Sequence, residues 1–339
     1  SGLAAAQVML KDGHPGKYFV KNGDTLWDIS ARFLEEPWQW PEIWQINEEI
    51  RNPHLIYPGD EIRLTYVNGE PRLSVKRGVE EKTLPNGTVK LTPKVREIAN
   101  DEAIPAIPAG AIAAYLKEGL VVSREEIAEA PYIVGGRDRR VIFGEGDTVY
   151  ARDVKDEWAD LQRGYGFYRV GEQYVDPDTN EVLGYEARQI GLGRVADHDE
   201  DMLTLRVTRS SEDLRIDDRL FSTEDRRVRS VLYPSAPDTK IEGKVIRFFD
   251  RISSVARNDV VVVNKGLRDG LKEGNVLDVF GQGEAVRDRQ RGDMVRLPRE
   301  RTGSMVIFRV FDKVSYGLIM ESTRPIYMND IAESPAGSY

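Results

Sequence analysis

The chain contains no cysteine, and its only histidines are His14, His54 and His198. The absence of cysteine excludes disulfide bonds, thiolate nucleophiles and cysteine-based metal sites. The histidines lie far apart and show neither an HxxxH nor an HExxH spacing, so we expect no histidine-based zinc site. No phosphate-binding loop or dinucleotide fingerprint occurs either. The sequence therefore predicts a protein without a resident metal or cofactor.

Long hydrophobic runs are also absent, and no stretch approaches the roughly 20 apolar residues that a transmembrane helix needs. The chain is acidic, with 57 acidic against 48 basic residues and a formal net charge of -9. Nucleic acids and anionic membranes are therefore unexpected partners, because both attract basic surfaces. A length of 339 residues predicts several domains.

Residues 1–16 are expected to be a flexible N-terminus or the remnant of a signal peptide. Ala4-Ala5-Ala6 fits the small-residue pattern that precedes signal-peptidase cleavage, although the apolar stretch that should come before it is missing. If the segment is such a remnant, the protein is exported, and we expect it in the periplasm.

Residues 17–66 carry the clearest local signals. Residues 18–20 are rich in β-formers and predict a strand. Asp24 or Thr25 can cap a first helix, and Pro41 suits the first turn of a second, whose apolar face would be Ile43, Ile46 and Ile50. Residues 61–64 alternate as a closing strand. The expected order is strand, helix, helix, strand, which is a small α+β module.

This segment resembles the LysM family over nearly its whole length, and the paired motifs at its two ends make the resemblance specific. The matching residues are Tyr18-x-Val20-x-x-Gly23-Asp24-Thr25-Leu26-Trp27-x-Ile29-Ser30, Ile46-Asn47 and Asn52-Pro53-x-Leu55-Ile56-x-Pro58-Gly59-Asp60-x-Ile62. The family often has glutamine where Asp60 stands.

LysM modules bind glycans that contain N-acetylglucosamine, so the resemblance implies a peptidoglycan-binding module. Such a groove needs outward backbone N–H and C=O groups, and apolar side chains beside them for the methyl of the acetamide. The resemblance implies that two loops form this groove. The expected glycan-binding residues are Gly23, Asp24, Thr25, Leu26, Asn52, Pro53, His54, Leu55 and Ile56. A single module should bind weakly, in the roughly micromolar to millimolar range.

Trp38, Trp40 and Trp44 crowd a stretch that is longer than in a minimal LysM module. They could stack on a sugar ring, but we favour a core role, because tryptophan contributes a large buried area to small domains.

Residues 67–130 are expected to form a hairpin and a short helical connector. The hairpin would pair residues 73–75 with 89–91 around Pro85-Asn86-Gly87-Thr88. Two short helices should follow Ile104-Pro105 and Ile107-Pro108, the first over 111–116 and the second opened by Ser123 and Glu126 as a capping box.

From residue 131 onward, short β-rich runs separated by turns predict mainly-β domains of the barrel or sandwich kind. We expect one over 131–233 and another over 238–335, separated by Pro234-Ser235-Ala236-Pro237. One pattern recurs as a turn that leads into a strand. Its copies are Gly146-Asp147, Asp217-Asp218, Gly274-Asn275 and Met328-Asn329-Asp330, with Gly59-Asp60 similar.

Two segments within the β region could be mistaken for binding sites. Gly191-Leu192-Gly193 precedes a strand rather than a helix, so it predicts a β-bulge or a turn rather than a phosphate cradle. The arginine-rich residues 284–301 mix both charge signs, which favours a solvated hairpin loop over a docking loop for an acidic partner.

The C-terminal half resembles a domain shared with a flagellar assembly protein, and the whole chain resembles the LysM-containing secretin-associated proteins of type IV pili. The motifs are Gly243-Lys244-Val245, Val260-Val261-Val262-Val263-Asn264-Lys265-Gly266-x-x-Asp269-Gly270-Leu271, Val295-Arg296-Leu297-Pro298-x-Glu300-Arg301-x-Gly303 and Phe308-x-Val310-Phe311-Asp312-x-Val314-Ser315-Tyr316-Gly317-Leu318. The resemblance implies a periplasmic protein that binds the cell wall and sits around the outer-membrane secretin, where a ring of weak contacts would gain avidity.

No pair of carboxylates is marked by a motif and no GxSxG occurs, so we expect no enzyme activity. The alternatives are an accessory or activator subunit of a cell-wall hydrolase, and a scaffold of another envelope machine such as a flagellum or secretion system.

Overall fold

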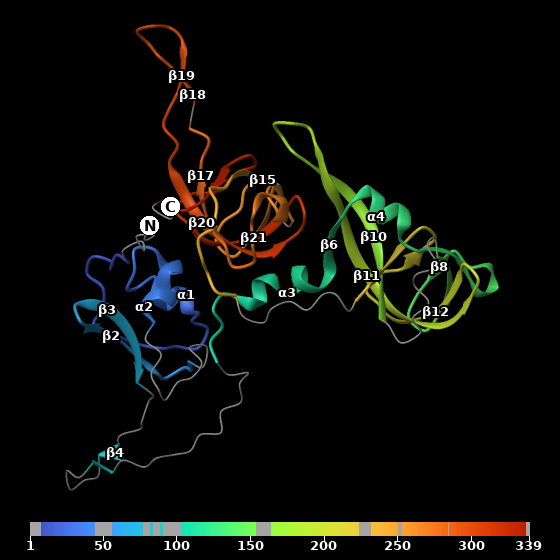
Figure 1. Cartoon of the computed structure of the whole chain (residues 1–339), viewed down its shortest axis with the longest axis horizontal. Coiled ribbons are helices and arrows are strands. Elements are labelled where there is room, and N and C mark those ends of the chain that lie inside the picture. The colour runs from blue at the N-terminus through green and yellow to red at the C-terminus, as the bar shows by residue number, and fades with distance from the viewer. Residues whose placement is uncertain are drawn as a thin grey trace.

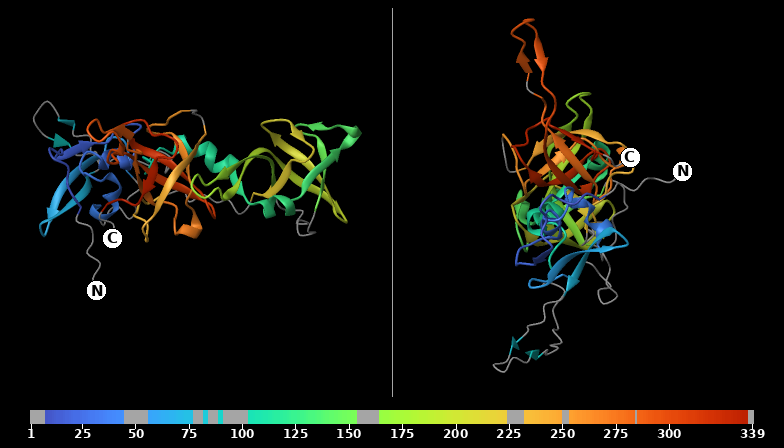
Figure 2. Two further views of the ribbon diagram at one scale, coloured as in Figure 1. Left: turned by 90° about the horizontal axis from the view of Figure 1, so that it is seen from above. Right: turned by 90° about the vertical axis from the view of Figure 1, so that its left-hand side faces the viewer.

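The computed structural model describes residues 8–44, 56–76, 82–83, 89–90, 103–153, 164–223, 232–249, 253–283 and 285–336. A small α/β module, a closed β-barrel and a twisted β-sheet follow one another along the long axis of the molecule, with the barrel in the middle (Figures 1 and 2). The predicted fold class, an α+β module followed by mainly-β domains, is confirmed.

The N-terminal module has the predicted strand, helix, helix, strand order, extended by one more strand. Its elements are β1 (Lys17–Phe19), α1 (Leu26–Ser30), the 3₁₀ turn η1 (Pro37–Gln39), α2 (Trp40–Ile43), β2 (Glu61–Val67) and β3 (Glu70–Lys76). α2 ends at Ile43 because Trp44 is already extended and bridges to Leu73. Ile46 and Ile50, expected on the second helix, lie outside the described residues.

The predicted hairpin between residues 73–75 and 89–91 is wrong. Residues 73–75 belong to β3, which pairs with β2 across a two-residue turn at Asn68 and Gly69. Both turn residues have positive φ, 53° and 87°, which is the backbone of the turns that favour tight hairpins. β4 (Lys82–Thr83) pairs instead with β5 (Val89–Lys90). The strand partner of residues 89–90 is therefore 82–83 rather than 73–75, and residues 73–75 pair across the Asn68-Gly69 turn.

The connector contains the two predicted helices, α3 (Ala109–Glu118) and α4 (Arg124–Glu129), and Ser123 caps α4 with Glu126 as expected. Between them lies β6 (Gly119–Val122), which pairs with β11 (Val182–Asp199). α3 runs from the N-terminal module past the barrel toward the sheet (Figure 1).

The seven-stranded sheet has the order β10-β14-β7-β9-β12-β11-β6 in the described part of the chain, and β10 also pairs with β11. Its further strands are β7 (Tyr132–Gly136), β9 (Thr148–Arg152), β10 (Gly164–Val175), β12 (Met202–Ser210) and β14 (Arg219–Ser222). The strands β8 (Ile142–Phe143) and β13 (Leu214–Arg215) form a separate two-stranded pair, and their Phe143 and Leu214 pack into the core of the larger sheet. The 3₁₀ turn η3 (Arg137–Arg139) comes just before β8 in the chain. A register shift between Leu192 and Gly193 within β11 is a β-bulge, the first of the two predicted alternatives.

The C-terminal barrel closes in the order β15-β16-β21-β20-β17-β22. Its strands are β15 (Glu242–Phe248), β16 (Val260–Val263), β17 (Val276–Phe280), β20 (Arg301–Val310), β21 (Ser315–Ser322) and β22 (Ile331–Glu333), with the 3₁₀ turn η4 (Leu267–Asp269).

The arginine-rich segment forms a separate hairpin of β18 (Ala285–Arg287) and β19 (Met294–Arg296) that projects as an arm (Figure 1). Its residues are largely exposed, as a solvated hairpin requires.

The recurring turn is a real structural device. In each predicted copy a residue of positive φ is followed by Asp or Asn, whose side chain accepts the backbone N–H three residues earlier, at distances from 2.7 to 3.0 Å. The accepting side chains are Asp60, Asp147, Asp218, Asn275 and Asp330. Asn258-Asp259 and Gly23-Asp24 are further copies that the sequence analysis missed. The side-chain bond replaces a water contact and fixes the direction in which the next element starts.

The tip of the β10–β11 hairpin is clamped to the barrel. Glu181 accepts hydrogen bonds from Arg268 at 2.7 and 2.9 Å and from Lys313 at 2.8 Å. Close by, the buried Asn264 donates to Asp176 at 2.7 Å. Tyr174 of β10 and Tyr316 of β21 also contact each other, in an apolar cluster that joins the sheet and the barrel. The sheet and the barrel are thus held by both an apolar and a charged contact.

We predict that the charged part of this clamp weakens in acid. Hydrogen bonds from Arg268 and then Lys313 lower the pKa of Glu181 from 4.5 to about 2. Because the folded-state pKa is depressed, the stabilisation is fully present above pH 4.5 and is lost as the pH falls toward 2. Glu181→Gln should remove it at neutral pH, at a cost of no more than about 1 kcal/mol because the pair is solvent-accessible.

The measurement is urea unfolding of Glu181→Gln and the parent protein at pH 7 and pH 3, in low and high salt. The difference between the two proteins should shrink at pH 3 and in high salt. A difference that stays constant across pH would contradict the role of the ionised carboxylate.

Candidate functional site

The first loop of the N-terminal module is fixed by its own hydrogen bonds. The Asp24 carboxylate accepts from the Tyr18 hydroxyl at 2.9 Å and from the Lys21 backbone at 2.8 Å. Burial, and then the hydrogen bond to Asp24, raises the pKa of Tyr18, so this phenol stays protonated and remains a donor. Gly23 has a φ of 87°, with open space where a side chain would be. The loop is therefore preorganised, and its backbone is accessible at Gly23.

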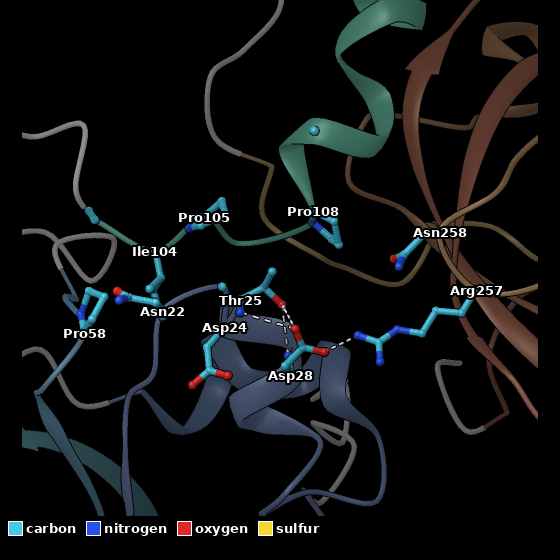
Figure 3. Close-up of a pocket in the computed structure, with 13 residues that line it drawn as sticks. Asn22, Asp24, Thr25, Asp28, Pro58, Ile104, Pro105, Pro108, Arg257 and Asn258 are labelled. Carbon is cyan, nitrogen blue, oxygen red and sulfur yellow. Dashed lines mark hydrogen bonds and ion pairs between the residues drawn. The ribbon is translucent and has the colours of Figure 1, made fainter.

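Thr25 and Asp28 close the loop as a capping box. The Asp28 N–H donates to the Thr25 hydroxyl at 3.1 Å, and that hydroxyl donates to the Asp28 carboxylate at 2.8 Å. Asp28 also forms an ion pair with Arg257 of the barrel (Figure 3). The Thr25 side chain is therefore committed to the loop itself. Its backbone is engaged as well, because its N–H donates to the Asp28 carboxylate at 3.3 Å and its carbonyl accepts from the Ile29 N–H at 3.1 Å.

The core beneath the loops contains most of the tryptophans. Trp40 and Trp44 are buried among Leu26, Ile29 and the other residues of the module, with their rings edge to face at 6.1 Å. Trp38 is also buried, but it belongs with Trp27 to the cluster shared with the barrel. The predicted core role of the three tryptophans is confirmed, because each is less than one tenth exposed. Trp38 adds a contact between domains.

A segment that the sequence analysis did not assign to the site crosses both loops. We call residues 103–108 the strap. The Leu26 N–H donates to the Pro105 carbonyl at 3.0 Å, and the Trp27 N–H donates to the Ala106 carbonyl at 3.2 Å. At the second loop, the Ile104 N–H donates to the Ile56 carbonyl at 2.8 Å. The two Ile-Pro pairs were the available signal, since a residue before proline prefers extended backbone.

The strap, the first loop and the barrel together line an open cavity of about 530 Å³. The first loop faces it with Asn22, Gly23, Asp24 and Thr25, and the barrel closes one end with Arg257 and Asn258 (Figure 3). Of the other expected glycan-binding residues, Leu26 and Ile56 are buried in the core beneath. Asn52, Pro53, His54 and Leu55 lie outside the described residues.

Residues 18–65 match the LysM domain family. The N-terminal module is therefore a LysM domain, which implies binding of peptidoglycan or a related carbohydrate. The chain is also similar to the uncharacterized protein YqbP of Bacillus subtilis, with 37% identity over 60 residues. That similarity covers 15% of this chain and 27% of the relative, so it extends to little beyond one domain.

The described residues also bear on two further features, a metal site and a membrane-spanning helix. There, no group of three or more His, Asp or Glu side chains could hold a metal ion. No helix of the described segments is both long and apolar enough to cross a membrane.

Proposed function

We propose that this is a non-catalytic periplasmic protein that binds peptidoglycan through its LysM domain and anchors the outer-membrane secretin of a type IV pilus machine to the cell wall. The observation that carries the proposal is the LysM domain at residues 18–65. The glycan would contact the first loop at Gly23, Asp24, Thr25 and Leu26, and the second at Asn52–Ile56.

The packing of the LysM domain on the barrel supports a tethering role. Trp27 and Trp38 are buried in the cluster shared with the barrel, and Asp28 and Glu36 pair with Arg257 and Arg301. A weak glycan contact is therefore carried on a larger body rather than on a free linker. Several copies around a ring would then engage the wall together, and their avidity would exceed that of one site.

Pelleting with purified peptidoglycan sacculi tests the wall-binding part. We expect the full chain to sediment with sacculi, and Gly23→Val to weaken this about tenfold or more, because a branched side chain would fill the space where the ligand approaches. Gly69→Val is the matched control: Gly69 has the same φ of 87° and the same open surroundings, but it lies in the β2–β3 turn. Equal losses in both variants would exclude the first loop as the binding site.

Two further experiments test the rest of the proposal. Co-purification with the secretin from envelope extracts of a piliated bacterium should succeed with the full chain, and its failure would leave only a wall-binding protein. Incubation with sacculi should release no muropeptides. Release on addition of a cell-wall hydrolase, beyond what that hydrolase achieves alone, would favour an activator role instead.

A further inference from the structure

The strap holds on to the two loops with the same kinds of group that an N-acetyl sugar offers. An acetamide presents one N–H, one carbonyl and one methyl group. The strap presents an N–H at Ile104, carbonyls at Pro105 and Ala106, and the apolar side chain of Ile104. That side chain is only 5% exposed and packs in the core of the LysM domain. Donors, acceptors and apolar group thus all meet complementary groups of the module.

We propose that the strap is a built-in competitor for the glycan, so that the LysM groove is closed in this structure and opens when residues 103–106 leave it. The proposal rests on the proposed function, because it assumes that these loops bind glycan. The N–H groups of Leu26 and Trp27 and the carbonyl of Ile56 each have a strap partner here. A glycan that uses them must displace the strap, since one backbone N–H cannot fully serve two acceptors.

The strap has two anchors that point to different bodies, and this makes partial release feasible. Ile104 packs in the LysM core, whereas Ile107, equally buried, belongs to the cluster shared with the barrel. Just beyond it, Ile112 of α3 packs in that same cluster, and Arg309 of the barrel donates to the Tyr115 carbonyl at 3.0 Å. Residues 103–106 can therefore swing out while α3 stays docked on the barrel.

The strap also contacts the junction between the LysM domain and the barrel, so its release from the groove would change contacts there. The Trp27 N–H donates to the Ala106 carbonyl of the strap, and the Trp27 side chain is buried in the cluster shared with the barrel. Asp28, the next residue, is paired with Arg257. Glycan capture would thus change contacts at the junction between the LysM domain and the barrel. The groove and the junction would respond together.

Removing the Ile104 anchor should strengthen glycan binding. When the competent state is only a fraction of the population, the apparent affinity is lowered by that fraction. Ile104→Ser removes most of the apolar side chain that holds the strap in place, so we expect apparent affinity for a soluble tetramer of N-acetylglucosamine to rise about tenfold or more. The full chain would be titrated with the tetramer by calorimetry. Ile112→Ser, at a similarly buried position in the barrel cluster, is the matched control and should leave the affinity unchanged.

Hydrogen exchange on the unmodified full chain provides a test that needs no variant. With saturating tetramer, amide exchange at Ile104 should accelerate, because its N–H loses the Ile56 carbonyl, while the N–H groups of Leu26 and Trp27 stay protected by the sugar.

If the tetramer binds but exchange in the strap does not change, or if Ile104→Ser binds no tighter while folded, the strap is a fixed part of the domain and the proposal is overturned. Equal gains in Ile112→Ser would also overturn it, by indicating general loosening. If neither the full chain nor folded Ile104→Ser binds the tetramer or sacculi, the proposed function fails, and the strap proposal falls with it.

Discussion

Replacing Trp40 with alanine is expected to unfold the LysM domain and abolish sedimentation with sacculi. Trp40 is 1% exposed and lies at the centre of the LysM core, edge to face with Trp44. Truncating such a buried aromatic costs about 3–5 kcal/mol. A module of about 50 residues rarely has stability to spare on that scale. The effect should exceed that of any single change in the loops, because the core positions both of them.

Circular dichroism and tryptophan fluorescence during thermal unfolding would follow this loss, together with the sacculi assay. Phe19→Ala is the control, since Phe19 lies on β1 of the same module but is 53% exposed. It should keep both stability and sedimentation. Sedimentation that survives in a Trp40→Ala protein whose LysM domain has melted would place the wall contact elsewhere in the chain.

The features that could be predicted from the sequence are those whose physics is local. Thr25 caps α1 and Ser123 caps α4 because a hydroxyl three residues before a carboxylate satisfies the first free amides of a helix. The turns at Asp147, Asp218, Asn275 and Asp330 were recognisable because a positive-φ position followed by a short polar acceptor is a chemical pattern within four residues.

The features that could not be predicted depend on partners far away in the chain. Nothing near Ile104 indicates that its N–H will meet the Ile56 carbonyl, or that its side chain will enter the LysM core. The contacts of the strap with Leu26, Trp27 and Ile56 could not be predicted from the loop sequences either. The hairpin error is of another kind, because the Asn68-Gly69 turn that pairs residues 73–75 with β2 is a local signal that the prediction passed over.

Tyr174 is another residue whose contacts are made with a distant part of the chain, and replacing it should have a large effect. It lies near the tip of β10, is 2% exposed, and packs among barrel residues that include Tyr316, with the two hydroxyl oxygens 3.5 Å apart. Burial raises the pKa of both phenols, that of Tyr316 to about 12, so both remain neutral at physiological pH. The contact is therefore mainly one of apolar packing between the sheet and the barrel.

Tyr174→Ala should separate the unfolding of these two bodies. Loss of a buried aromatic at their junction costs about 3–5 kcal/mol, and the cost falls on the docking rather than on either separate core. Calorimetry should then resolve two transitions, and small-angle scattering should show a longer, more variable particle. Tyr174→Phe should behave like the parent, because it keeps the ring and removes only a weak hydroxyl contact. If Tyr174→Ala lowers one transition without splitting it, Tyr174 stabilises a single cooperative unit, and the barrel and sheet do not unfold independently.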